Sequence, residues 1–212
     1  QTRFKMRSVL VTGGNQGIGF ALCKQLAIEH NCHVFLTARD PSRGQAAVSK
    51  ISEAIANTPS CTGSVDFLAL DTSNDASVAK AAADAKQKLS GDNRLYGIVN
   101  NAGIGLRTGN QGDIINTNLY GPKRVVDNFL DLLDQKEGRI VNLGSGSGPK
   151  YTGGCSQEDK KFLCSPESAT VDLIESHWKR KLNGSDAYGL SKSLLACYTG
   201  ILAREHPNIL SS

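Results

Sequence analysis

Short apolar runs alternate along the chain with longer segments in which apolar residues recur every three or four positions. The short runs are rich in β-branched and aliphatic residues and end at glycine or polar residues, which is typical of buried strands. The longer segments have the period of an amphipathic helix. This pattern predicts strands at 8–14, 32–39, 64–71, 95–103 and 138–146, and helices at 18–29, 40–56, 74–89 and 114–135.

The alternation of strands and helices predicts an α/β fold. Successive strand–helix–strand units form a parallel sheet, and their helices cover both of its faces. Because neither a linker nor a tandem repeat interrupts the sequence, we expect residues 1–212 to form one domain around a doubly wound parallel sheet. The first helix is expected to pack against this sheet through one apolar face, made of Ile18, Leu22, Leu26 and Ala27.

Residues 148–186 form an insertion that interrupts this alternation. Its first half is polar and is expected to be a loop. Its second half, 167–182, is expected to be a short amphipathic helix on the domain surface, because four apolar residues recur at helical spacing. These residues are Val171, Ile174, Trp178 and Leu182. We interpret Trp178 as the anchor of this helix rather than as a residue that stacks on a ligand.

Composition and charge narrow the class of protein. Hydrophobic residues make up 39% and charged residues 21%, which allows an ordinary buried core and does not indicate disorder. The net charge of +4 is mild. It is compatible with a phosphorylated ligand but far from the dense basic patch of a nucleic-acid-binding protein. No apolar run approaches the roughly 18 residues that span a bilayer, and the first residues do not resemble a signal peptide. We therefore expect a cytoplasmic protein without a membrane or nucleic-acid partner.

The cysteines and histidines indicate no metal site. The six cysteines are scattered, without a C-x-x-C pair or a His/Cys cluster at zinc spacing. Free buried thiols in a reducing compartment explain them better than disulfides do. The cysteines are Cys23, Cys32, Cys61, Cys155, Cys164 and Cys197. The four histidines are interpreted as surface or packing residues, and they are His30, His33, His177 and His206.

A glycine-rich turn joins the first strand to the first helix. The segment "TGGNQGIG" has the spacing Gly13-x-x-x-Gly17-x-Gly19. Glycines allow a tight turn and let the backbone approach a pyrophosphate at the helix N-terminus, where N–H groups and the helix dipole favour an anion. No Gly-Lys-Ser/Thr follows, which excludes a Walker A loop. Taken alone, such a loop indicates no more than a tight turn, but its place after the first strand favours nucleotide binding.

The end of the second strand, "LTARD", indicates which dinucleotide is bound. A guanidinium such as that of Arg39 matches a 2′-phosphate and stacks on adenine. Asp40 is the alternative, because an acidic residue here bonds the ribose 2′-OH in NAD sites. Asp40 followed by Pro41 is more typical of a helix N-terminus, so the sequence favours NADP(H).

Four separated motifs resemble those of the short-chain dehydrogenase/reductase family. They are "TGGNQGIG", "NNAG" at 100–103, Ser145 after the fifth strand, and Tyr188-x-x-x-Lys192. The tracts "TARDPSRGQAAV" and "VNLGS" and the insertion are similar to the carbonyl reductase branch. The resemblance covers residues from about 7 to 206 and implies a Rossmann-type fold.

The resemblance also implies the site residues. Arg39 falls on the 2′-phosphate position, and Asp71 with Thr72 falls where the family holds the adenine. The cofactor-binding positions are Gly13, Asn15, Gln16, Gly17, Ile18, Gly19, Arg39, Asp71, Thr72, Asn100, Ala102, Gly103, Tyr188 and Lys192. The catalytic positions are Asn118, Ser145, Tyr188 and Lys192.

The residue types suit reduction of a carbonyl group. Nicotinamide carries the hydride, so the protein must orient the carbonyl and supply a proton. A tyrosine is a plausible acid, although its ordinary pKa of about 10 is high for work near neutrality. A lysine four residues later lies on the same helix face, and its charge favours the phenolate. Ser145 would hydrogen-bond the substrate oxygen, and the family assigns Asn118 to a water that returns the proton through Lys192. Outside this context, Tyr188 and Lys192 would be an exposed pair without a role.

The sequence departs from the family in three places. Gln16 stands where carbonyl reductases often have a basic residue. The segment 104–117 is short, either through a true deletion or because residues are missing from the sequence. The chain also ends where the sixth strand of the family begins, so we expect five strands and suspect that a C-terminal part is missing. Met6, the only methionine, could be the native start.

These observations favour an NADPH-dependent reductase of ketones, aldehydes or quinones. The alternatives are an NAD-dependent alcohol or steroid dehydrogenase of the same fold, which Arg39 opposes, and an NADP(H)-binding sensor or scaffold without turnover. The insertion resembles one that covers the association surface in monomeric carbonyl reductases, so we expect a monomer.

Overall fold

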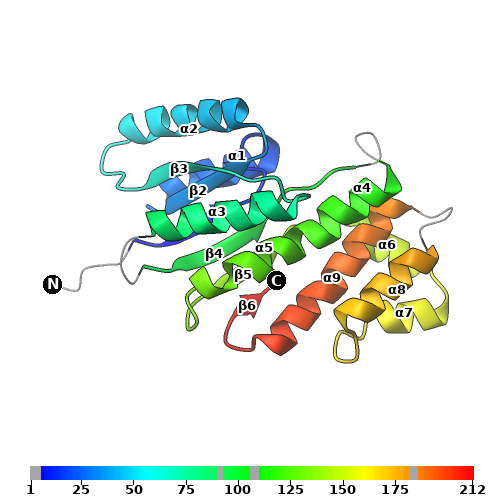
Figure 1. The fold of residues 1–212 in the computed structure, drawn as a ribbon. Helices are drawn as coiled ribbons and strands as arrows, with labels where there is room; N and C mark the ends of the chain where they lie inside the picture. The colour runs from blue at the N-terminus through cyan, green and yellow to red at the C-terminus, as the bar shows by residue number, and fades with distance from the viewer. Residues whose placement is uncertain (1–5, 90–92, 106–109, 182–185) are drawn as a thin grey trace.

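The computed structural model of the chain describes residues 6–89, 93–105, 110–181 and 186–212. Within these ranges the strands form one parallel sheet in the order β3-β2-β1-β4-β5-β6 (Figure 1). This order confirms the doubly wound Rossmann-type sheet. The strands are β1 Ser8–Val11, β2 His33–Ala38, β3 Ser64–Ala69, β4 Leu95–Asn100, β5 Arg139–Asn142 and β6 Leu210–Ser211.

The helices follow the strands as the periodicity predicts, with ends that shift by a few residues. The long helices are α1 Gly17–Ile28, α2 Pro41–Ala56, α3 Asp75–Lys88, α5 Gly121–Phe129, α8 Val171–Lys181 and α9 Ala187–Glu205. The short ones are α4 Gln111–Ile115, α6 Ser147–Gly153, α7 Gln157–Leu163, a π-helix η1 at Asn116–Tyr120 and a 3₁₀ turn η2 at Leu130–Leu132.

The central strands β1, β2 and β4 have no exposed residue, because helices cover both faces of the sheet, and this explains why they read as continuous apolar runs. Along β1, Val9 and Val11 face the layer formed by α1 and α2. Leu10 lies between them and faces the opposite layer, formed by α3, α5 and α9. The two layers cover opposite faces, and sheets of this kind bind ligands at the carboxyl ends of their strands.

Three sequence expectations about these elements are wrong. Ile18 is 67% exposed, because the buried side of α1 consists of Gly19, Cys23 and Ala27. The expected helix 114–135 is divided into α4, η1, α5 and η2. The expected five strands are six, since Leu210–Ser211 pairs in parallel with β5.

The first half of the insertion is helical rather than a loop. It contains α6 and α7, and α7 begins with a side-chain cap in which Ser156 Oγ accepts from Asp159 N at 3.2 Å. Such a cap satisfies an N–H group that the helix leaves without a partner, and it stabilises short helices. The second half forms the expected helix, α8. Leu182, expected on its apolar face, lies outside the described residues.

Trp178 anchors α8 to the core of the molecule, as expected. Its indole Nε1 donates to the Tyr120 hydroxyl at 2.8 Å, and the two rings meet edge to face with centroids 6.3 Å apart. Tyr120 belongs to η1, so the insertion is fastened to the segment that also carries Asn118. Figure 1 shows α7 and α8 beside α9.

The cysteines are unpaired but only partly buried. Cys23, Cys32 and Cys197 are buried, whereas Cys164 is exposed. Of the histidines, His177 is the most enclosed, at 2% exposure, and stacks on Phe162. Among the described residues, no helix is long and apolar enough to cross a membrane. The same residues contain no group of three or more metal-ligating side chains.

Candidate active site

The predicted site residues gather at one edge of the sheet. They follow the carboxyl ends of β1 to β5 or lie on η1 and α9, which cross the same edge. In open α/β sheets this edge is where ligands bind. A cavity of about 540 Å³ lies at the opposite, amino edge and contains none of the predicted residues; it is lined by Met6, Arg7, His30, Asn31, Thr62, Arg94, Tyr96, Asp134 and Glu137.

The glycine loop has the backbone geometry that its residues predict. Gly17 has φ +56°, in the left-handed region where side chains are strained. A Cβ on Gly19 would lie 2.4 Å from the carbonyl oxygen of Gly13, so the first turn of α1 packs closely on the loop. Gln16, the N-cap of α1, makes no side-chain cap hydrogen bond. The helix therefore presents N–H groups that no capping side chain occupies, which favours an anion.

Thr12 and Asn101 hold this loop in place, and neither was predicted as a site residue. Thr12 Oγ1 accepts from the backbone N–H groups of Asn101 at 3.0 Å and Ala102 at 2.9 Å. Asn101 Nδ2 donates back to the carbonyl oxygens of Thr12 at 2.8 Å and Gly13 at 3.2 Å. The loop after β1 and the loop after β4 thus form one hydrogen-bonded unit. Both residues lie inside the motifs "TGGNQGIG" and "NNAG", and this position was the signal that could have identified them.

Asn100 lies at the end of β4 and connects the central strands. Its Nδ2 donates to Asn142 Oδ1 at 2.8 Å, and Asn142 Nδ2 donates to Thr199 Oγ1 at 2.8 Å. Asn100 Oδ1 is buried without a hydrogen-bond partner among the described residues. A buried acceptor of this kind is costly when unpaired, so it is a candidate to accept from a bound ligand or water.

The end of β2 resolves the two interpretations of "ARD". Asp40 caps α2, because its Oδ1 accepts from Arg43 N at 3.1 Å. This confirms the helix-cap interpretation. Arg39 is exposed. Beside the glycine loop lies a cavity of about 320 Å³, lined by Asn15, Gln16, Phe20, Arg43, Ala46, Ala47 and Lys50. Two of these side chains, Arg43 and Lys50, are cationic, and neither was predicted as a site residue.

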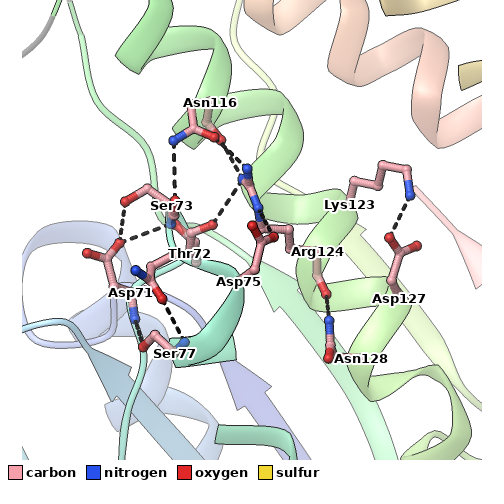
Figure 2. A network of polar contacts seen from close by, with 11 residues as sticks. Asp71, Thr72, Ser73, Asp75, Ser77, Asn116, Lys123, Arg124, Asp127 and Asn128 are labelled. Carbon is pink, nitrogen blue, oxygen red and sulfur yellow. Dashed lines mark hydrogen bonds and ion pairs between the residues drawn. The ribbon is translucent and has the colours of Figure 1, made fainter. Parts of the chain in front are cut away.

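Asp71 and Thr72 lie in the loop between β3 and α3. Asp71 Oδ1 accepts from the backbone N of Ser73 at 2.9 Å and from its hydroxyl at 2.6 Å. Thr72 is 6% exposed. Figure 2 shows both residues beside a polar network that reaches across to η1 and α5.

Asn118 occupies the π-helical segment and is buried at 1% exposure. Its Nδ2 donates to the carbonyl oxygen of Ile104 at 2.9 Å, and its Oδ1 accepts from the N–H of the same residue at 2.8 Å. Nδ2 also contacts Ser191 Oγ at 3.1 Å. Single π turns occur frequently at functional sites, and here one holds an asparagine against the loop after β4.

Lys192 and Tyr188 lie one turn apart on α9. Lys192 Nζ is 5.9 Å from the ring centre of Tyr188 and donates to the carbonyl oxygen of Leu143 at 2.7 Å. Burial lowers the pKa of Lys192 from its ordinary value of 10.5. A Cβ on Gly103 would lie 3.2 Å from Asn118 Oδ1 and 3.9 Å from Lys192 Nζ, which places all three residues around one space.

Ser145 follows β5 and is half-buried. Its Oγ accepts from Ser147 N at 3.2 Å, at the start of α6. No hydrogen bond joins Ser145 to Tyr188 or Asn118 in the part of the chain that the structure describes. The structure therefore brings Asn118, Lys192 and Gly103 together, with Tyr188 alongside Lys192, while Ser145 lies on a separate hydrogen-bonded turn.

Comparison with known proteins matches this arrangement to one family. The model of "short chain dehydrogenase" matches residues 7–156. A (+)-neomenthol dehydrogenase of Arabidopsis thaliana is 32% identical over 241 residues, covering 95% of this chain and 79% of the relative. Carbonyl reductase [NADPH] 3 of Rattus norvegicus is 34% identical over 217 residues, covering 94% and 74%. The solved menthone neomenthol reductase of Mentha piperita aligns with a TM-score of 0.80 at 26% identity, covering 97% of this chain and 87% of that one.

Proposed function

The chain belongs to the short chain dehydrogenase family, and on that premise we propose that it reduces carbonyl compounds with NADPH. The substrates would be ketones, aldehydes or quinones. The observation that carries the proposal is the approach of Lys192 Nζ to within 5.9 Å of the Tyr188 ring, beside the buried Asn118. An acid and a fixed positive charge in that relation suit proton donation to a substrate oxygen.

The glycine loop and the residues near it fit a dinucleotide phosphate. Gly17 leaves open space at the uncapped start of α1, and Gly19 lets that helix pack closely on the loop, which suits a pyrophosphate at the helix N-terminus. Arg39 follows β2, and Arg43 and Lys50 line the cavity beside the loop. Together these cations suit the 2′-phosphate that distinguishes NADP(H) from NAD(H). The rat relative, carbonyl reductase [NADPH] 3, is named for the same cofactor, which supports this assignment.

The chain's own residues would carry the proton chemistry. When bound, NADPH would supply the hydride. The Tyr188 hydroxyl would donate the proton to the substrate oxygen, and Ser145 would hydrogen-bond that oxygen as negative charge develops on it. Lys192, held by the Leu143 carbonyl, would favour the phenolate left after the transfer. Asn118 would hold a water, from which a proton would return to the phenolate through Lys192.

The proposal is tested by NADPH oxidation on a panel of quinones, ketones and aldehydes, with NADH as the comparison. Turnover of at least one carbonyl class with preference for NADPH is the expected result. Turnover only with NAD(H) and an alcohol would replace the proposal with a dehydrogenase of the same fold. NADPH binding without turnover of any panel member would favour a sensor or scaffold.

We further propose that the protein is a monomer. Trp178 and α8 cover Tyr120, and the insertion packs along α9. The helix after Asn118 and the helix that carries Tyr188 are the ones through which many members of the family are expected to associate. Light scattering on the purified chain gives the test, and a mass two or four times that of one chain would contradict the proposal.

A further inference from the structure

Arg124, on α5, joins two segments that are far apart in sequence, the start of α3 with the loop before it and the π-helix η1. Its Nε donates to Asp75 Oδ1 at 2.6 Å, and its Nη1 approaches the carbonyl oxygen of Thr72 at 3.5 Å. On the other side, Nη2 donates to Asn116 Oδ1 at 2.7 Å, and Nη1 donates to the Asn116 carbonyl oxygen at 3.2 Å. Figure 2 shows the guanidinium between these two groups of acceptors.

Asn116 closes the connection. Its Nδ2 donates to the carbonyl oxygen of Ser73 at 3.3 Å, so the amide and the guanidinium both bridge from η1 to the β3–α3 loop. Asn116 precedes Asn118 by two residues in the same π-helical segment. The position of the catalytic candidate therefore depends on the same contacts that fix the loop containing Asp71 and Thr72.

The β3–α3 loop and the start of α5 also pack directly against each other beside the contacts of Arg124. A Cβ on Gly121 would lie 3.1 Å from both Cβ and Oγ1 of Thr72, so the start of α5 rests on that residue. The Arg124 side chain is 20% exposed, whereas its partner Asp75 is 85% exposed. Because an exposed ion pair contributes little, the contacts to Asn116 and Thr72 are the distinctive part of the arrangement. A planar fork of donors is needed to reach them all, and lysine lacks one.

We propose that Arg124 is a positioning residue that holds the adenosine-binding loop, with Asp71 and Thr72, at a fixed place relative to Asn118. This inference rests on the proposed function, since it assigns the loop to the adenosine half of NADP(H). Arg124 reaches the loop directly at the carbonyl oxygen of Thr72, and it acts on Asn118 through Asn116. Its loss is expected to weaken binding of the adenosine half and to misplace Asn118 together, because a displacement of about 1 Å in an active site can cost on the order of 100-fold in rate.

The test measures binding of 2′,5′-ADP, the adenosine half alone, by calorimetry at 15 °C. Arg124→Gln is expected to raise its Kd by about tenfold relative to wild type, and Arg124→Lys to recover less than half of that loss on a logarithmic scale, since the fork is absent. Lys123→Gln is the matched control, because Lys123 is the neighbouring cation on α5 and pairs with Asp127 instead. Its Kd is expected to stay within twofold of wild type.

Two further measurements separate positioning from a merely structural role. The double variant Arg124→Gln/Asn116→Ala is expected to bind 2′,5′-ADP as tightly as whichever single variant binds it less tightly. The reason is that both substitutions break the same connection between η1 and the β3–α3 loop. With saturating NADPH, Arg124→Gln is also expected to reduce kcat by about tenfold. A lower melting temperature with unchanged Kd and kcat, or additive losses in the double variant, would overturn the proposal.

The outcome also distinguishes this inference from the proposed function. Wild-type protein that binds 2′,5′-ADP but reduces no carbonyl compound would contradict the proposed function, and the Kd comparison would still decide the role of Arg124. Wild-type protein that does not bind 2′,5′-ADP would overturn both.

Discussion

The ammonium group of Lys192 lies 5.9 Å from the ring centre of Tyr188, one turn along α9. The same ammonium group donates to Leu143 at the end of β5, so it is held in place from outside the helix. A tyrosine–lysine pair on an isolated helix surface would lack this hydrogen bond. The position of Lys192 is therefore fixed by the segment that follows β5 as well as by its spacing from Tyr188 on the helix.

Replacing Tyr188 with phenylalanine is expected to lower kcat for carbonyl reduction by about 10²–10⁴-fold, the usual contribution of a positioned acid. The Kd for NADPH is expected to change by less than about threefold, because the ring remains and only the acid is removed. Stopped-flow reduction and fluorescence titration measure the two quantities. Tyr96→Phe, at the amino edge of the sheet, is the control and is expected to retain wild-type kcat. Equal rates for wild type and Tyr188→Phe would remove the tyrosine from the mechanism.

Lys192 makes the stability of the protein depend on pH at alkaline values. Its folded-state pKa is lowered by burial, so between that value and 10.5 the unfolded chain binds more protons than the folded one. The free energy of unfolding contributed by this group therefore rises with pH through that window, and below it the buried charge is a constant penalty. Urea unfolding from pH 7 to 10.5 should show wild type gaining stability relative to Lys192→Met as the pH rises. Lys24→Met, which removes an exposed charge, should run parallel to wild type; a parallel Lys192→Met curve would contradict the expectation.

Arg39 is expected to set the choice between NADPH and NADH. Hydrogen bonds to charged groups contribute about 1.5–3 kcal/mol. Arg39→Leu should therefore lower kcat/KM for NADPH by roughly 10–100-fold and leave that for NADH within about threefold. Steady-state kinetics with both cofactors give the ratio. Lys80→Leu, which removes an exposed cation on α3, is the control. Parallel losses with both cofactors would show that Arg39 does not read the 2′-phosphate.

Gly19 is expected to tolerate no side chain. An added Cβ would meet Gly13 O at 2.4 Å and Asn101 Nδ2 at 2.5 Å, so Gly19→Ala must displace the glycine loop or the loop after β4. We expect a rise in the Kd for NADPH of at least about tenfold and a loss of about 1–3 kcal/mol in the free energy of unfolding. Gly153→Ala is the matched control, because a Cβ there meets nothing within 4 Å. Similar Kd values for both variants would mean that the close approach at Gly19 is unimportant.

The sequence predicted the sheet and its connections well because local pattern decides them. The central strands β1, β2 and β4 are largely apolar runs without an exposed residue, and helix starts such as Asp40–Pro41 carry their own capping chemistry. The prediction for Ile18 failed for a different reason. The small residues Gly19, Cys23 and Ala27 let α1 pack closely on the sheet, and Ile18 is directed outward.

The parts of the site that could not be predicted depend on contacts between distant segments. A period of 3.6 residues does not reveal the π turn at Asn116–Tyr120, where Asn118 bonds to Ile104 in a loop. Arg124 gave no signal either, because its acceptors lie at 72, 75 and 116 and converge only after folding. The motifs indicated Asn118 and Lys192, but not what holds them in place.

Because β1 lies in the interior of the sheet, one of its edges stays unpaired until a later part of the chain has been synthesised. β1 pairs with β2, which follows soon after it, but its other edge pairs with β4, whose residues come almost ninety positions later. At a synthesis rate of about 5–20 residues per second, that edge stays open for roughly 4–18 seconds. An open apolar strand edge is a template for aggregation. We therefore expect the nascent β1–β3 half to depend on chaperones until β4 emerges, and translation pauses between β3 and β4 to lower the yield of folded protein.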